Sequence, residues 1–417
     1  MFAKSFLGSG AVTAFNAFRA FAINKLLAIF LPPAAFACVG QFLNLMSIGQ
    51  ATSSLALQNG WTSLTAQHKD DEKSLLGVWR GGVRLTTFAT IFTCVAAVLF
   101  CFMAPLETLF PGMNTRLVQA AILFSLPGIF ATNLITICAA VMNGLGQNRK
   151  WALINMVASA WQVLWVAFFL YTERLSVLSI IATQSIFAGI FAMQIASRAG
   201  FSLKRIWSTA LDTREPWVSY ALMGLVPMIL SPVVLTVIRV SVDTSFGHDA
   251  AGIWQSIWKI SDFLFMMMSA ILCVIILPKV SARLSRGDFQ KLFYPLLLRV
   301  MGISLAVTLV LYFGRGILVQ VLLSSAYMGA VDYMPLQLVG DFFRSGGYAL
   351  ALVLIARRET MTFLSIEILG ELFLAVGTLV GIKFLEFNGP MAAYAAENFL
   401  YFVIMFIAVG RLKWNAQ

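Results

Sequence analysis

Long apolar runs are the feature that most constrains the fold of this chain. Stretches of about 20 apolar residues, enough for a helix to cross about 30 Å of hydrocarbon, recur twelve times in the 417 residues. Because 60% of the residues are hydrophobic and only 11% are charged, the solvent around most of the chain is a bilayer, and a soluble or disordered protein is excluded. The backbone has no water to bond inside a bilayer, so spans of this length are expected to be helices. We therefore predict an all-α polytopic membrane protein with about 12 transmembrane helices.

The apolar runs divide into two equal groups. The longest hydrophilic connection near the middle, residues 198–216, leaves six runs on each side. Equal halves are typical of two-lobed transporters whose site lies between the lobes. We predict an N-lobe at 1–200, a cytoplasmic linker at 201–215 and a C-lobe at 216–417, around a central cleft. The expected spans are 5–30, 36–60, 82–103, 117–142, 151–170, 176–197, 216–240, 252–277, 294–313, 333–356, 362–382 and 390–410.

Basic residues are distributed unevenly between alternate loops. If both termini are cytoplasmic, 19 of the 29 Lys and Arg residues lie in cytoplasmic segments and six lie inside spans. Only Arg116, Arg174, Arg315 and Lys383 lie on the opposite face. Because cytoplasmic loops carry an excess of Lys and Arg, this asymmetry predicts cytoplasmic termini. It also accounts for the net charge of +11 without a nucleic-acid partner.

Residues for soluble chemistry are scarce. The five cysteines fall in apolar runs without CxxC or Cys/His ligand spacing, and the two histidines lie in loops, so neither a metal site nor a disulfide framework is indicated. The segment GLGQNRK at 144–150 lacks the GxxxxGK[ST] pattern and a preceding strand, which excludes a phosphate-binding loop. We expect a protein that is not an enzyme and that has no cofactor and no metal.

Charged residues inside the spans of the second half are the strongest functional signal. A charge at the bilayer centre costs a few kcal/mol or more, so such residues usually face a cavity and carry function. Lys259 and Asp262 are three residues apart, as are Asp341 and Arg344, so each pair shares a helix face. For one pair alone, a structural salt bridge and a functional role are equally good interpretations. Two such pairs in one half favour a lined aqueous cavity.

Two further acids lie four residues apart in a later span. Glu367 and Glu371 share a helix face, and repulsion between like charges favours the retention of a proton by one of them. Such a carboxylate suits a carrier that is driven by an ion gradient. Alternatively, each acid neutralises a different neighbouring cation. Asp341, Glu367 and Glu371 are therefore candidate ion-coupling residues, with a proton or sodium gradient as the source of energy.

The two halves differ in the sign of their buried charges. The first six spans contain Arg19 and Lys25 and no acid, whereas every acid inside a span belongs to the second half. The first-half cations therefore need an anion from across the cleft or from the substrate. Lys25 is alternatively a structural cation bonded to helix-end carbonyls, but Arg19 lies near mid-depth. Polar residues on the first two helices, including Asn44, suit the hydroxyls of a sugar, or else bind neighbouring helices.

Three segments resemble a known family. They are AGIWQSIWKISD at 251–262, PLQLVGDFFRSGGYALALVLIARRET at 335–360 and NKLLAIFLPPAAFACVGQFLNL at 24–45. These segments resemble the Wzx-type polysaccharide flippases, within the multidrug/oligosaccharidyl-lipid/polysaccharide exporter superfamily. The similarity is nearest to the branch that carries precursors of enterobacterial common antigen and O-antigen. It covers most of the chain and implies twelve helices in two lobes of six.

The resemblance implies a carrier in the bacterial inner membrane. Members of this family move an undecaprenyl-diphosphate-linked oligosaccharide from the cytoplasmic to the periplasmic leaflet by alternating access. Lys25, Asp262 and Asp341 lie in matched stretches, Arg344 stands where the family has a lysine, and Asn44 stands where it has an arginine. Membrane lipids, a glycan polymerase and a chain-length regulator are candidate further partners. The candidate substrate-binding residues are Arg19, Lys25, Asn44, Lys259, Asp262, Asp341 and Arg344.

Two other functions remain open at this point. A multidrug or cation antiporter of the same superfamily would need an acidic cavity in its binding lobe. A flippase for peptidoglycan precursors would use cationic residues in a similar way. Such proteins usually have extra helices, however, and this chain has little room for them.

Overall fold

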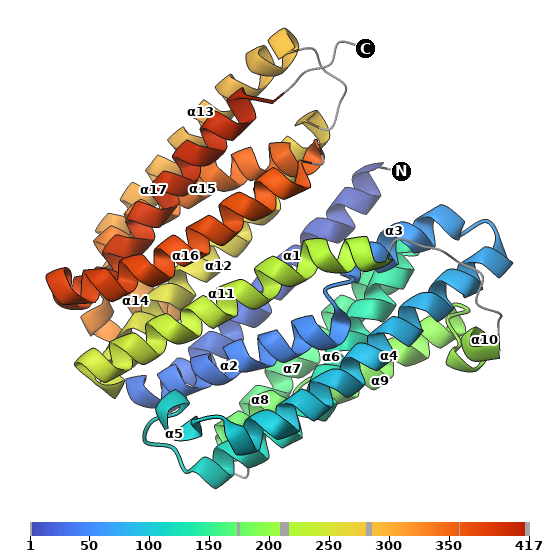
Figure 1. Ribbon diagram of the computed structural model, residues 1–417, viewed down its shortest axis with the longest axis horizontal. Coiled ribbons are helices and arrows are strands. Elements are labelled where there is room, and N and C mark those ends of the chain that lie inside the picture. The colour runs from blue at the N-terminus through green and yellow to red at the C-terminus, as the bar shows by residue number, and fades with distance from the viewer. Residues whose placement is uncertain (1, 173–175, 209–216, 281–285, 358, 413–417) are drawn as a thin grey trace. The chain divides into compact units, whose positions relative to one another are not determined.

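A computed structural model describes residues 2–172, 176–208, 217–280, 286–357 and 359–412 (Figure 1). Throughout these ranges the regular structure is helical, and they contain no strand. The expected all-α fold is therefore confirmed. The loop cations Arg174, Arg214, Arg283, Arg358 and Lys413 lie outside the described residues, and the orientation that they help to predict stays a prediction.

Long helices coincide with each expected span. The shortest of the unbroken ones have 22 residues, which at 1.5 Å per residue makes about 33 Å, enough to cross the hydrocarbon. They are α1 (Phe2–Phe30), α2 (Pro33–Ser54), α4 (Glu72–Met103), α6 (Thr115–Gly144), α7 (Asn148–Thr172), the pair α8 (Val177–Thr183) and α9 (Ile186–Arg198), α11 (Trp217–Phe246), α12 (His248–Val280), α13 (Arg286–Phe313), α15 (Met334–Ala356), α16 (Thr360–Leu385) and α17 (Gly389–Gly410).

Shorter helices join these spans. They are α3 (Gln58–His68), α5 (Leu106–Leu109), α10 (Leu203–Ser208), α14 (Arg315–Leu322) and the 3₁₀ helices η1 (Ser325–Ala330) and η2 (Glu386–Asn388). At the start of α4, Asp71 accepts a hydrogen bond from the backbone N–H of Lys73 and another from the Ser74 hydroxyl. The hydrogen bond from Ser74 is the main reason that the pKa of the Asp71 carboxyl lies below its usual range.

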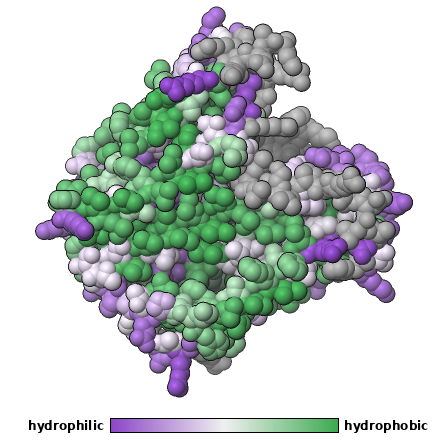
Figure 2. All heavy atoms as spheres, in the orientation of Figure 1, coloured by the Kyte–Doolittle hydropathy of each residue, from purple (hydrophilic) through white to green (hydrophobic). Residues whose placement is uncertain are grey.

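Apolar side chains on the outer faces of the helices agree with a membrane location. Within the described residues, eight stretches are long and apolar enough to cross a bilayer, and one of them covers both α16 and α17. On α4, Phe88 is 75% exposed and Phe102 is 75% exposed. Figure 2 shows apolar residues over much of the visible face. An exposed patch of this extent is rare on a soluble monomer, so lipid contacts these side chains.

The second span ends earlier than expected. The sequence predicts a helix over 36–60, but α2 ends at Ser54, and Leu55 and Ala56 adopt left-handed φ values of 51° and 49°. The Ser54 hydroxyl donates to the carbonyl of Gln50 and accepts from the backbone N–H of Ala56. Local hydrogen bonds of this kind compete with the helical ladder, so the chain turns here before α3 begins.

The sixth span is broken near its centre. Gln184 and Ser185 separate α8 from α9. Beside this break, α6 approaches so closely that a Cβ atom on Gly128 would lie 1.8 Å from the carbonyl oxygen of Ala182. Only glycine fits such a contact between helices in a membrane, and it fixes the broken span against α6.

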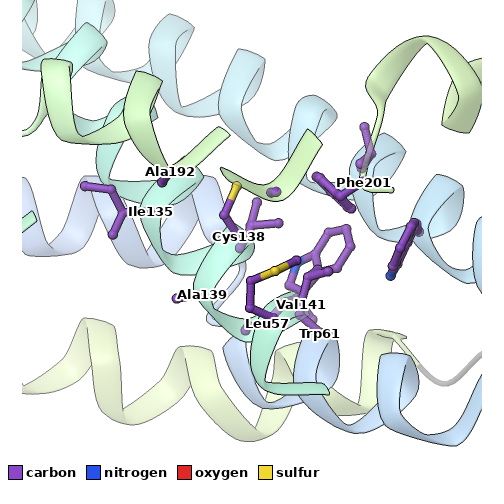
Figure 3. Packing of buried hydrophobic residues seen from close by; sticks show 14 of the residues in the cluster. Leu57, Trp61, Ile135, Cys138, Ala139, Val141, Ala192 and Phe201 are labelled. Atoms are coloured by element: carbon purple, nitrogen blue, oxygen red, sulfur yellow. The ribbon is translucent and has the colours of Figure 1, made fainter. Parts of the chain in front are cut away.

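Contacts divide the chain into two compact units. We call Met1–Leu26 with Cys38–Pro232 the N-unit, and Leu27–Ala37 with Val233–Gln417 the C-unit. The N-unit core includes Trp61, Cys138 and Phe201 (Figure 3). The C-unit core gathers around α13 and α15. The lobes expected at 1–200 and 216–417 stay a prediction, as does the linker, of which residues 209–215 lie outside the described ranges.

The contact between α6 and α8 makes Gly128 a sensitive position. We expect Gly128→Ala to lower the thermal unfolding temperature in detergent, because the added methyl overlaps a backbone carbonyl; overpacking of this kind costs about 1–3 kcal/mol. Gly302→Ala is the matched control, since Gly302 also lies within a long helix and no atom lies within 4 Å of the position that its Cβ would take. Equal unfolding temperatures for the two variants would contradict the close approach.

Candidate functional site

Glycines on α15 bring two tyrosines of α17 against its backbone. A Cβ atom on Gly340 would lie 2.4 Å from the ring of Tyr394, and one on Gly347 would lie 2.6 Å from the ring of Tyr401. Helices pack this closely in membranes when small residues line the contact. Within the C-unit, α15, α16 and α17 therefore lie side by side (Figure 1), and the tyrosine hydroxyls meet the charged residues of α15 and α16.

Asp341 is held by two hydroxyl groups. The Tyr394 hydroxyl donates to Oδ1 of Asp341 at 2.8 Å, and the Ser261 hydroxyl of α12 donates to Oδ2 at 2.9 Å. The carboxyl group also lines a cavity of about 240 Å³ among α12, α13 and α15, whose walls are mainly apolar. Each carboxylate oxygen thus has one neutral donor.

Arg344 lies between an acid, an aromatic ring and the same tyrosine. Its guanidinium lies 3.7 Å from Oδ1 of Asp262 and 3.8 Å above the centre of the Phe265 ring. Its Nη1 also donates to the Tyr394 hydroxyl at 3.3 Å. Spacing along the helix places Asp341 and Arg344 on one face, as the sequence predicts. Tyr394, however, stands between them as the bridging group.

A second group of acids lies where α16 meets α17. The Tyr401 hydroxyl donates to Oε1 of Glu367. Glu397 approaches Gly370, where a Cβ atom would lie 2.9 Å from its Oε1. Glu397 also lies within electrostatic reach of Glu367 and Glu371. The two acids that the sequence places on one face of α16 thus share their surroundings with a third from α17.

Acids outnumber bases in this part of the C-unit. Arg344 interacts electrostatically with Asp262, Asp341, Glu367 and Glu397. A second cation, Lys259, interacts with Asp262 and with Arg239. Since unpaired charge is costly away from water, a cluster with more carboxylates than cations holds a proton or attracts a cation. We call Asp262, Asp341, Arg344, Glu367, Tyr394, Glu397 and Tyr401 the acidic cluster.

In the N-unit, Arg19 on α1 has neutral hydrogen-bond partners. Nη1 of Arg19 donates to the side-chain carbonyl of Gln162 at 2.6 Å, and the Gln162 amide donates to the Ser185 hydroxyl at 2.9 Å. Nε of Arg19 is buried and has no hydrogen-bond partner among the described residues. Ser185 lies at the break between α8 and α9, and broken helices often mark substrate sites in transporters.

The other first-half candidates also lie in the N-unit. Lys25 is half-buried on α1, six residues after Arg19. Asn44 is buried on α2, and its Nδ2 has no hydrogen-bond partner in the described part of the chain. The only acid of the described long helices of this unit is Glu72, at the start of α4, where it binds Arg205. The positive charge of Arg19 therefore has neutral partners.

Several residues of these sites are not apparent from the sequence. Tyr394 and Tyr401 hold the two acids, Ser261 completes the contacts of Asp341, and Gln162 binds Arg19. One signal was available, because Tyr394, Glu397 and Tyr401 are spaced by three and four residues and so share a face of α17. Gln162 stands alone in an apolar run, and Ser261, beside Asp262, has no partner at helical spacing that would single it out.

The described residues contain no group of three or more His, Cys, Asp or Glu side chains that could hold a metal ion.

Curated relatives are similar to nearly the whole chain. The lipid III flippase of Escherichia coli K12 is 24% identical over 406 residues, covering 96% of each chain, and that of Shigella flexneri has the same values. No family model matches the sequence. These relatives confirm the resemblance to flippases.

Solved structures share the fold at low sequence identity. An inward-facing multidrug resistance MATE family transporter of the MOP superfamily has a TM-score of 0.77 at 13% identity, covering 96% of this chain and 94% of its own. The lipid II flippase MurJ in an inward closed conformation has a TM-score of 0.72 at 12% identity, covering 97% and 87%. These likenesses confirm the multi-pass transporter fold.

The excess of acids makes Arg344 the key cation of the acidic cluster. We expect Arg344→Ala to lower the thermal unfolding temperature more at pH 8 than at pH 5, because protonation relieves the repulsion that the arginine offsets. The side chains of Arg344 and Asp262 are partly exposed, so the expected loss at pH 8 is smaller than the about 3–5 kcal/mol that removing one partner of a fully buried pair costs. The control is Arg299→Ala, since Arg299 is exposed on α13. A loss independent of pH would contradict this electrostatic role.

Proposed function

We propose that this protein is a flippase for an undecaprenyl-diphosphate-linked oligosaccharide, either an O-antigen unit or lipid III of enterobacterial common antigen. The observation that carries the proposal is Arg19, which donates to a neutral amide and whose buried Nε has no partner among the described residues. The curated lipid III flippases, similar over 96% of the chain, support the same substrate class.

An arginine with neutral partners suits a diphosphate. Guanidinium groups bind phosphate oxygens through paired, charge-assisted hydrogen bonds. Arg19 keeps its full charge beside Gln162, and Lys25 adds a second cation on the same helix. Asn44 offers an unused amide N–H, which fits a sugar hydroxyl. Lys259, Asp262, Asp341 and Arg344 are proposed to bind the same substrate in the C-unit.

The chemistry of the substrate favours a carrier over an enzyme. The polyprenyl chain is stable in lipid, whereas the diphosphate and the glycan are stable only in a polar environment. We propose that the protein transfers the polar part by alternating access and breaks no bond. No bound cofactor is required, since one charge moved across 100 mV provides about 2.3 kcal/mol. Asp341, Glu367 and Glu371 are the proposed ion-coupling residues, for a proton or for sodium.

The proposed location follows from the substrate. Undecaprenyl-diphosphate glycans are assembled at the bacterial inner membrane, so we place the protein there with both termini cytoplasmic. The excess of Lys and Arg in the corresponding loops supports this orientation. A glycan polymerase and a chain-length regulator would act on the product after it reaches the periplasmic leaflet.

The acidic cluster favours one alternative, a drug or cation antiporter. Its carboxylates would suit an amphipathic cation, and the MATE transporters share the fold. The two functions differ in the ligand that stabilises the purified protein. We expect undecaprenyl-diphosphate-linked disaccharide to raise the thermal unfolding temperature and ethidium to leave it unchanged. The opposite result would favour the antiporter.

Arg19 provides the direct test of substrate binding. We expect Arg19→Ala to lower the transfer of a fluorescent undecaprenyl-diphosphate-linked disaccharide in proteoliposomes by about 10-fold or more, because a hydrogen bond to a charged group contributes about 1.5–3 kcal/mol. Arg116→Ala is the matched control, since Arg116 is exposed at the start of α6. Normal transfer by Arg19→Ala would remove the arginine from the proposed site.

A further inference from the structure

The Tyr394 hydroxyl is hydrogen-bonded to both Asp341 and Arg344. It donates to Oδ1 of Asp341 at 2.8 Å and accepts from Nη1 of Arg344 at 3.3 Å. The described residues contain no direct ion pair between these two side chains; the ion pair of Arg344 is with Asp262. A change of charge on Asp341 therefore reaches Arg344 in two ways, directly through electrostatics and through the shared hydrogen bonds of Tyr394.

We propose that Tyr394 is a positioning residue that ties the place of the Arg344 guanidinium to the charge on Asp341. The inference rests on the proposed ion coupling, and it adds to that coupling a residue and a physical link. A phenol hydroxyl has one proton and acceptor lone pairs. While Asp341 is charged, the proton points at its carboxylate and the lone pairs are open to Arg344.

Protonation of Asp341 reverses this arrangement. A neutral carboxyl group has its own proton to donate; the oxygens of Tyr394 and Ser261 lie at 2.8 Å and 2.9 Å, and we take the Tyr394 oxygen as the acceptor. That bond competes with Arg344 for the same oxygen and removes the negative charge that Arg344 faces. The guanidinium then keeps Asp262, 3.7 Å away in this structure, as its ion-pair partner. Neutralising Asp341 thus moves Arg344 toward Asp262.

The surroundings fix the tyrosine and leave the charged groups room to move. The Tyr394 ring packs edge-on against Trp258, with 5.3 Å between ring centres, and lies against the backbone of Gly340. Arg344 lies over the flat face of Phe265, a contact that tolerates sliding. Asp341 lines the cavity of about 240 Å³, so its carboxyl group has space to rotate.

Other ionisable groups surround this link and enter any dependence on pH. They come from four helices of the C-unit. The set is Lys259 and Asp262 on α12, Asp341 and Arg344 on α15, Glu367 and Glu371 on α16, and Glu397 and Tyr401 on α17. Of these, Tyr401 donates a hydrogen bond to Glu367. This second contact between a tyrosine and an acid serves as a comparison for the contact between Tyr394 and Asp341.

The test removes the hydroxyl and keeps the ring. We expect Tyr394→Phe to move the midpoint of the pH dependence of thermal unfolding, measured in detergent between pH 5 and pH 8, upward by about one pH unit. The direction follows because the hydroxyl donates to the charged form of Asp341, and its loss disfavours that form. Tyr327→Phe is the matched control, since its buried hydroxyl also gives up one hydrogen bond, of 3.0 Å to the carbonyl of Leu31. This control should lower the unfolding temperature at every pH alike.

The Asp341→Asn background shows whether the effect passes through Asp341. In that background we expect Tyr394→Phe to cause no further shift of the midpoint, whereas Tyr401→Phe, which acts on Glu367, should still alter the profile. A Tyr394→Phe profile that superimposes on the wild type apart from a constant offset would overturn the inference. A shift that persists in Asp341→Asn would overturn it equally.

The same variants separate this inference from the proposed function. Transfer of fluorescent undecaprenyl-diphosphate-linked disaccharide is measured in proteoliposomes between pH 5 and pH 8. If the wild type transfers none, the proposed function fails, while the unfolding profiles still judge the role of Tyr394. If the wild type transfers the probe, we expect Tyr394→Phe to move the pH midpoint of transfer in the same direction as that of unfolding. An unmoved midpoint of transfer would count against the positioning role.

Discussion

A charged group inside a membrane helix must find its partners within the protein, and this constraint shapes the C-unit. Asp341 obtains two hydroxyl donors, and one of them, Tyr394, also accepts from Arg344. That contact requires α17 to touch the backbone of α15, which the glycine at 340 permits. The close packing of α15, α16 and α17 is thus a condition for placing acids where lipid alone would exclude them.

The two units answer the same constraint with opposite chemistry. In the N-unit, Arg19 donates to the Gln162 side chain, which in turn donates to the Ser185 hydroxyl. Both partners are neutral, so the positive charge of Arg19 is not compensated by them. The C-unit surrounds Arg344 with carboxylates that outnumber the nearby cations. A site of the first kind is suited to an anion, and a site of the second kind to a proton or a cation. Both kinds of site fit the proposed carrier, in which transfer of an anionic lipid is coupled to an ion.

Sequence alone predicted the parts of the fold that depend on local composition. The spans were found because hydropathy and length are properties of consecutive residues, and the shared face of Asp341 and Arg344 follows from helical periodicity. The end of α2 at Ser54 was missed because it depends on a hydrogen bond from the serine hydroxyl to the backbone. Such a bond does not change the hydropathy of residues 36–60, from which the helix was predicted. Tyr394 was missed because it lies 53 residues from Asp341, and only packing brings the two together.

The places where the backbone passes from one unit to the other have a mechanical consequence. It passes between Leu26 and Leu27, between Ala37 and Cys38, and between Pro232 and Val233. All three points lie inside α1, α2 and α11, and none lies in a loop. A change in the orientation of one unit would therefore bend these helices. In α11 the boundary falls at Pro232, whose ring nitrogen lacks the hydrogen that would otherwise tie it to the preceding turn, so a bend there costs less than in a regular turn.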